Sequence, residues 1–131
     1  MKKAVCALMA AVCLGSLASC GNKVDTDIGT PGSPDGTWEL VEAESEGEYL
    51  DAKKEDWFEQ FKISGTEGTY TVKYQSLDKT YDVTVEKKSG DEYDIKMRGL
   101  LSMGTAKFGT KKMVYEMGEG DAKSILVYEK K

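Results

Sequence analysis

Three cysteines are the residues of this chain best suited to chemistry, and all of them lie within the first 20 positions: Cys6, Cys13 and Cys20. A thiolate can act as a nucleophile, bind a soft metal or form a disulfide. The chain contains no histidine. A Cys–His nucleophile pair and a zinc site of the usual nitrogen and sulfur kind are therefore excluded, and the sequence predicts neither a metal nor a cofactor.

Carboxylates are the remaining groups that could serve as acids, bases or metal ligands. Two close pairs occur, Asp78 with Asp82 and Glu119 with Asp121. Both lie in or beside predicted turns, where acidic residues serve solvation and turn formation. A calcium site or an acid–base site is the less favoured interpretation, and we expect the protein not to be an enzyme.

The cysteines belong to a segment with the features of an export signal. Lys2 and Lys3 give a positive start, residues 4–14 form an apolar run, and small residues precede Cys20. This order is typical of a secretory signal peptide. The apolar run is shorter than the ~20 residues that a membrane-spanning helix needs, so a retained membrane helix is the weaker interpretation.

The end of this segment, Leu17-Ala18-Ser19-Cys20, resembles the lipobox of bacterial lipoproteins at all four positions. The resemblance implies that residues 1–19 are removed and that Cys20 becomes the lipidated first residue. Its acyl chains would then anchor the protein in a membrane, because stable attachment takes more than one chain. The alternative is an ordinary signal peptide in which Cys20 is incidental.

Localisation and charge follow from the residues beyond the cysteine. Gly21 stands where an inner-membrane retention signal would have aspartate, so the resemblance implies the outer membrane or the cell surface, as in Bacteroidetes-type lipoproteins. Loss of Lys2 and Lys3 leaves 16 basic against 23 acidic residues, a net charge of −7. An acidic surface disfavours nucleic-acid binding, which rewards clustered lysine and arginine.

Composition divides the mature chain into two parts. Residues 20–35 hold both prolines together with Gly, Thr, Ser and Asp, a composition that buries little and predicts a flexible tether. With a reach of roughly 20 Å, such a tether would hold the following domain clear of the lipid headgroups. Residues 36–131 are predicted to form one globular domain without a disulfide.

Apolar and polar residues alternate through this domain at the period of half-buried antiparallel strands. A short helix or loop is expected over 51–57, with a strand beginning near Phe58. Turn-forming residues fill nearly every gap between strands, which favours an all-β meander closed into a small up-and-down barrel, with a two-sheet sandwich as the alternative. About eight strands are predicted, over residues 37–44, 57–64, 69–74, 80–87, 92–98, 103–109, 112–117 and 123–130.

The start of the domain, Gly36-Thr37-Trp38-Glu39-Leu40, resembles the Gly-x-Trp opening of lipocalin-like (calycin) barrels, and the hairpin FKISGTEGTYTVKY over 61–74 resembles their second and third strands. The resemblance implies that Trp38 closes one barrel end beneath an arginine from late in the chain. The only arginine is Arg98, in mid-chain, so the plug is made differently or is absent. Alternatively, Trp38 is simply a large core residue.

One predicted connection is unusually apolar. The segment RGLLSMG over 98–104 carries Leu100, Leu101 and Met103 between glycines, although connections normally run over the surface. These side chains would form a lid over a barrel end or an exposed contact patch. The alternative is that a strand runs longer and they fill the core.

Two functions from different classes fit this architecture. The first, which the sequence favours, is binding of a small apolar or amphipathic ligand inside the barrel. The second is a protein-interaction module, an inhibitor or accessory subunit in the cell envelope, in which the barrel core is solid and the acidic surface meets a partner. The residues expected to line a ligand site are Tyr70, Tyr74, Tyr81, Tyr93, Met97, Leu100, Leu101, Met103 and Tyr115.

Overall fold

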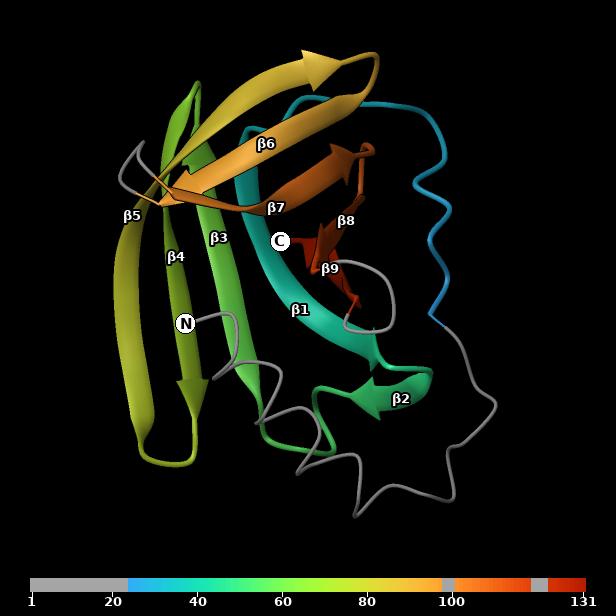
Figure 1. Ribbon diagram of the computed structural model, residues 1–131, viewed down its shortest axis with the longest axis vertical. Coiled ribbons are helices and arrows are strands. Elements are labelled where there is room, and N and C mark those ends of the chain that lie inside the picture. Colours follow the sequence, from blue (N-terminus) through green and yellow to red (C-terminus); the bar gives the residue numbers. More distant parts are fainter. Residues whose placement is uncertain (1–23, 98–100, 119–122) are drawn as a thin grey trace.

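The computed structural model describes residues 24–97, 101–118 and 123–131, and within these ranges all regular structure is β-strand (Figure 1). Each strand pairs antiparallel with its neighbours in the sheet, as expected for the predicted meander. The strands are β1 (Gly36–Ser45), β2 (Glu48–Asp51), β3 (Phe58–Ser64), β4 (Glu67–Tyr74), β5 (Leu77–Ser89), β6 (Glu92–Met97), β7 (Leu101–Phe108), β8 (Lys112–Met117) and β9 (Ser124–Lys130).

The sheet closes because β1 pairs with the last strand as well as with its early neighbours. Along one edge, β1 pairs with β9 from Trp38 opposite Lys130 to Ser45 opposite Ser124, with a bulge at Val41. Along its other edge, β1 pairs first with β3 and then with β2. Eight strands therefore form a closed barrel, and β2 is an additional hairpin strand. The barrel, rather than the two-sheet sandwich, is the architecture.

The eight predicted strands are confirmed, and the ninth, β2, went unpredicted. Its four residues are too few to show a period, and only Leu50 among them is buried. The turn before it, Glu46-Gly47, has positive φ at both residues, which suits a tight hairpin. Residues 52–56 form turns and β3 begins at Phe58, as expected.

The apolar connection expected over 98–104 is shorter than predicted. β7 begins at Leu101, so the last part of the segment belongs to a strand, as the alternative interpretation held. Met103 is half-buried and packs against the core. Leu100 lies outside the described residues, and the side chain of Leu101 is likewise not described.

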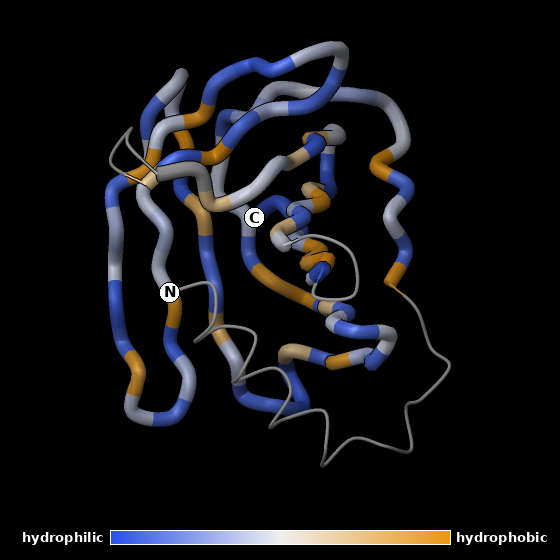
Figure 2. Tube along the Cα trace, viewed as in Figure 1, coloured by the Kyte–Doolittle hydropathy of each residue, from blue (hydrophilic) through white to orange (hydrophobic). Residues whose placement is uncertain are grey.

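Strand alternation places one apolar core inside the barrel. Figure 2 shows apolar residues interspersed with hydrophilic ones along the strands, as a half-buried sheet requires. The largest of the fully buried inward side chains are aromatic: Trp38, Phe61, Tyr70, Phe108, Tyr115 and Tyr128. Phe61 lies at their centre, with its ring 4.8 to 5.5 Å from those of Tyr70, Tyr115 and Tyr128.

Trp38, near the start of β1, is a buried core residue whose contacts the sequence left open. The indole is fully buried, donates from Nε1 to the carbonyl oxygen of Pro34 at 2.8 Å, and meets the ring of Phe108 edge-on. The Nζ of Lys130 lies 5.5 Å from the Trp38 ring centroid, within the range of a cation–π interaction. A late lysine therefore stands over the tryptophan where the resemblance implied an arginine.

Residues 24–35, which we call the N-terminal strap, follow one flank of the barrel before entering β1 (Figure 1). Val24 is buried and, with Ile28, joins a second apolar cluster with the outward-facing Val114 and Val127. Gly32 donates to the carbonyl of Phe108 at 2.9 Å. Composition predicts a flexible tether here, and the difference arises because the two apolar residues of the strap meet an apolar stripe that only the folded sheet creates.

Candidate functional site

Among the described residues, Glu59 is the one acid in the barrel interior, and it is fully buried. It lies on β3 between Trp57 and Phe61, and the period of two places all three side chains on the inner face. One carboxylate oxygen, Oε1, accepts hydrogen bonds from the hydroxyl of Tyr70 at 2.7 Å and from that of Tyr128 at 2.9 Å. β3, β4 and β9 thus converge on one carboxyl group.

Burial controls the ionisation of this cluster. The loss of solvent raises the pKa of Glu59 above its ordinary value, and the hydrogen bonds from Tyr70 and Tyr128 oppose that rise only in part. Burial and the nearby carboxylate likewise raise the pKa of both tyrosines. The cluster therefore favours a neutral Glu59 and neutral tyrosines.

Three buried polar atoms in this region lack a hydrogen-bond partner among the described residues: Glu59 Oε2, Tyr115 OH and Trp57 Nε1. Such groups are uncommon inside proteins and call for an explanation.

Trp38, Glu59, Phe61, Tyr115 and Tyr128 all expose no surface, so no water-sized space adjoins them. The barrel centre is packed by its own side chains.

The predicted ligand-lining residues divide between this packed centre and the barrel wall. Tyr70 and Tyr115 lie in the centre, and Tyr74 is buried with its ring 5.2 Å from that of Trp57. Tyr81 is half-buried beside Tyr70, at 6.3 Å between ring centroids.

The others lie nearer the surface or outside the description. Tyr93 contacts the ring of Phe108 at 5.4 Å, and Met97 and Met103 are half-buried. Cys20 and Leu100 lie outside the described residues. The structure therefore brings Tyr70, Tyr74, Tyr81 and Tyr115 into one core cluster and places Tyr93 against Phe108, which also contacts Trp38.

Glu59 is the interior residue that sequence reasoning missed. A signal was present, because the alternation in WFEQF places position 59 on the same face as Trp57 and Phe61. An acid at an inward position of a strand is an exception to binary patterning, and such exceptions mark special sites.

A second region of interest lies outside the barrel, on β1 and β9 between β2 and the strap. This outer groove has a volume of about 930 Å³. The partly exposed Val41 contributes apolar surface beside the buried Val127, and lysines and carboxylates supply charges of both signs. Its lining residues are Asp25, Val41, Glu42, Tyr49, Asp51, Thr110, Lys111, Lys112, Val127, Glu129, Lys130 and Lys131.

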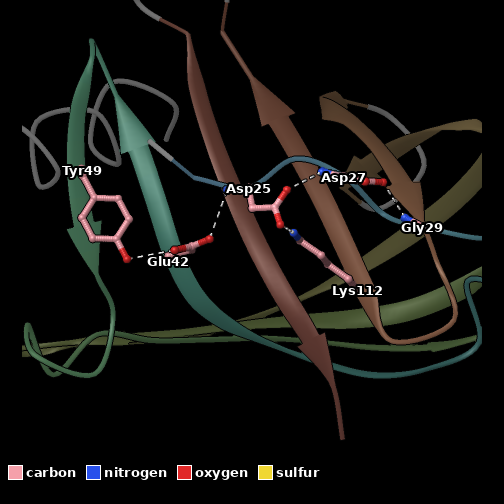
Figure 3. A network of polar contacts seen from close by, with 6 residues as sticks. All are labelled: Asp25, Asp27, Gly29, Glu42, Tyr49 and Lys112. Atoms are coloured by element: carbon pink, nitrogen blue, oxygen red, sulfur yellow. Dashed lines mark hydrogen bonds and ion pairs between the residues drawn. The ribbon is translucent and has the colours of Figure 1, made fainter. Parts of the chain in front are cut away.

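Figure 3 shows the polar network that ties the strap to this groove. Tyr49 donates to Glu42 Oε1 at 2.9 Å, and Glu42 Oε2 accepts the backbone N–H of Asp25 at 3.3 Å. Asp25 in turn forms an ion pair with Lys112 at 3.3 Å and accepts the N–H of Asp27 at 3.0 Å. β1, β2, β8 and the strap are thereby linked through side chains.

The charges in the groove stay accessible to solvent, in contrast to Glu59. Partial burial and the hydrogen bond to Glu42 raise the pKa of Tyr49 to about 12. The backbone N–H of Asp27 and the ammonium of Lys112 lower the pKa of Asp25. Asp25 is therefore ionised at neutral pH, and Tyr49 keeps its proton.

Other kinds of site find little support in the described ranges. Within them no group of three or more acidic or sulfur ligands is arranged to hold a metal ion. Asp78 and Asp82 are exposed on β5, whereas Glu119 and Asp121 lie outside the description. Residues 24–97, 101–118 and 123–131 contain no helix with the length and hydropathy needed to cross a bilayer.

Comparison with protein-family models, with curated proteins and with solved structures finds no match to this chain.

Proposed function

We propose that the protein is an envelope lipoprotein whose lipocalin-like barrel acts as a protein-interaction module through its outer surface. The observation that carries the proposal is the packed interior: five large side chains at the barrel centre expose no surface. Known ligand pockets have volumes of about 300–1,000 Å³, and a centre without water-sized space offers no such volume. Recognition by the outer surface is the function that remains for a solid barrel.

The charge of the outer surface supports a protein partner. The mature chain has a net charge of −7, which attracts a basic partner and speeds its association. The outer groove is a hollow lined by Val41 and Val127 and by charges of both signs. A flat surface, or a surface of one charge, would lack the shape and the charge pattern by which a partner recognises its site.

The anchor in this proposal is an acylated Cys20 in the outer membrane. Only residues 21–23 separate Cys20 from the buried Val24. Four Cα–Cα steps span at most about 14 Å, so the strap would hold the barrel close to the bilayer rather than at the end of a long tether. The partner would then be another envelope protein.

Site-specific photocrosslinking in the native envelope tests this function. We expect a photoreactive residue at Thr110, which is exposed in the outer groove, to give a crosslinked species of discrete mass. Lys88, exposed on β5 outside the groove, provides the control position. Crosslinks from Thr110 no stronger than those from Lys88 would contradict a partner at the groove.

A small lipophilic ligand is the second candidate. It is favoured by the partly exposed apolar residues Leu77, Tyr81 and Met103 at the margin of the core. Quenching of tryptophan fluorescence by fatty acids would support it, whereas an unchanged emission across a panel of lipophiles would speak against it.

A further inference from the structure

The N-terminal strap is held to the barrel more loosely than the strands are held to one another. Within residues 24–33 only Val24 is buried, and most of the others are exposed. The backbone pairing of this stretch with the barrel consists of an isolated bridge, Pro31 opposite Gly109, and the hydrogen bond donated by Gly32. A segment with few buried apolar contacts and little backbone pairing opens locally while the rest of a protein stays folded.

The first residues of the strap depend on side-chain contacts that border the solvent. Val24 donates its backbone N–H to Glu44 at 3.4 Å, and Asp25 donates its own to Glu42 at 3.3 Å. Figure 3 shows the contacts of Asp25, whose side chain is 75% exposed and forms the ion pair with Lys112. Exposed ion pairs contribute little to stability because water and salt screen them. The burial of Val24 is therefore the main attachment of this end.

The strap is fixed more firmly where it enters β1. The indole Nε1 of the buried Trp38 donates to the carbonyl oxygen of Pro34 at 2.8 Å, and the backbone N–H of Gly65 donates to Asp35 at 2.7 Å. Both contacts belong to the last two residues of the strap, and neither involves residues 24–33. Pro34 is therefore the point about which the rest of the strap can turn.

The docked strap covers apolar surface next to the outer groove. Val114 of β8 and Val127 of β9 lie directly opposite each other on the outer face, and Val24 packs against them. Both are buried, at 3% and 1% exposure. Val127 also lines the outer groove, beside the partly exposed Val41. Without the strap, Val114, Val127 and Val41 would form one apolar stripe across three strands.

We propose that the strap is a releasable cover of this stripe: residues 24–33 turn away about Pro34 while the barrel stays folded, and an apolar side chain of the partner protein then packs on Val114 and Val127. In the docked form Val24 occupies that place and excludes the partner. The inference rests on the proposed interaction function and adds that the partner binds the released form.

Release would also change the distance between the barrel and the anchor. From an acylated Cys20 the chain reaches Val24 in four Cα–Cα steps, but it reaches Pro34 in 14 steps. Fourteen steps span at most about 50 Å, compared with about 14 Å for the docked strap. A partner that captures the released form could therefore hold the barrel farther from the bilayer.

Thiol labelling of the lipid-free mature domain, residues 21–131, tests the release, because this stretch contains no cysteine. Val114→Cys places a thiol beneath the strap, and Val85→Cys places one at a buried position inside the barrel. We expect the thiol at position 114 to react about tenfold faster or more, since it needs only the strap to open. Equal rates at the two positions, or a rate at position 114 equal to that of the urea-unfolded chain, would overturn the proposal.

A strap variant links the labelling to docking. A Cβ added at Gly32 would lie 2.7 Å from the carbonyl oxygen of Gly109, so Gly32→Ala forces the strap away from the barrel without changing the barrel itself. It should raise the labelling rate of Val114→Cys about tenfold and leave that of Val85→Cys unchanged. Thr30→Ala, at an exposed strap position, is the control. The same rates in Gly32→Ala and Thr30→Ala would contradict a cover formed by the strap.

Photocrosslinking from Thr110 in the native envelope tests the effect on the partner. Val24→Ser weakens docking and should raise the crosslink yield by up to about fivefold, because the binding-competent form becomes more populated. Thr26→Ser should leave the yield unchanged. A yield that Val24→Ser does not raise would remove the cover from the account. Crosslinks from Thr110 no stronger than those from Lys88 in the wild type would instead contradict the proposed function itself.

Discussion

Two glutamates on opposite sides of the same barrel wall accept hydrogen bonds of nearly equal length from tyrosine hydroxyls. Inside, Glu59 accepts from Tyr70 at 2.7 Å and from Tyr128 at 2.9 Å. Outside, Glu42 accepts from Tyr49 at 2.9 Å. The inner acid is fully buried, whereas the outer pair borders the solvent-filled groove. Both glutamates accept hydrogen bonds from tyrosine hydroxyls, but the two acids differ in their access to solvent.

That difference decides what each contact does. A buried hydrogen bond that loses one partner leaves the other partner both desolvated and unpaired, whereas water replaces a lost partner at the surface. The Glu59 contacts therefore hold three strands together, and the Glu42 contact is free to change partners. The interior is the structural half of the molecule, and the outer face is the half suited to recognition.

Removing each acid gives the largest expected contrast. Glu59→Ala leaves the hydroxyls of Tyr70 and Tyr128 without an acceptor and opens a void, which should lower the free energy of unfolding by about 2–4 kcal/mol. Glu42→Ala should change it by no more than ~0.5 kcal/mol, the usual range for surface positions. Urea denaturation of the mature domain measures both, and equal losses would erase the distinction between the two regions.

The pH dependence of stability gives the next contrast. Because burial raises the pKa of Glu59 in the folded protein, the folded form retains a proton that the unfolded form has released. Glu59 therefore stabilises the folded protein at pH values below its ordinary pKa. As the pH rises from that value toward the raised pKa of the folded protein, the free energy of unfolding falls, by about 1.4 kcal/mol for each pH unit that separates the two pKa values. Glu59→Gln should remove this decline.

Denaturation midpoints of the wild type and Glu59→Gln across the acidic to neutral range test that expectation. Glu42→Gln, the same exchange at the outer acid, is the matched control. A Glu59→Gln profile parallel to the wild type would mean that the buried acid ionises as readily in the folded protein as in the unfolded chain.

Single hydroxyl deletions give a smaller contrast. Tyr128→Phe removes one of the two donors to Glu59 and should cost about 1–2 kcal/mol of unfolding free energy, since both partners are buried. Tyr49→Phe should cost no more than ~0.5 kcal/mol. Thermal denaturation of the two variants compares them directly, and a larger loss for Tyr49→Phe would contradict the roles assigned here.

The strap gives the smallest expected effect. Val24→Ser exchanges a buried apolar side chain for a polar one and should destabilise the docked strap by about 1 kcal/mol. Hydrogen exchange of the Gly32 amide, which donates to Phe108, should accelerate while the β9 amides stay protected. Thr26→Ser, at an exposed strap position, is the control, and unchanged Gly32 exchange in Val24→Ser would show that Val24 does not hold the strap.

The sequence predicted those features of the fold that depend on local alternation. The inward positions of Tyr70, Val72 and Tyr74 follow from a period of two, and so do the inward positions of Val83 and Val85. Short turns then require neighbouring strands to pair. Features that depend on distant partners were not predicted.

Three residues illustrate that limit. Val24 docks only because the folded sheet aligns Val114 and Val127 on its outer face. Lys130 reaches Trp38 because β9 closes against β1. Glu59 is tolerated because Tyr70 and Tyr128 arrive from strands 11 and 69 residues away in sequence. Each of these contacts depends on the register between strands that are distant in sequence. A local sequence pattern does not predict that register.

Native mass spectrometry of the mature protein, released gently from its own envelope, tests most directly the claim that the barrel is solid and works by its outer surface. A solid barrel should give a mass equal to that of the acylated chain, with no apolar molecule bound at fixed stoichiometry, and the same mass after incubation with fatty acids. A stoichiometric lipophilic adduct that survives desolvation would contradict it and would place the function inside the barrel.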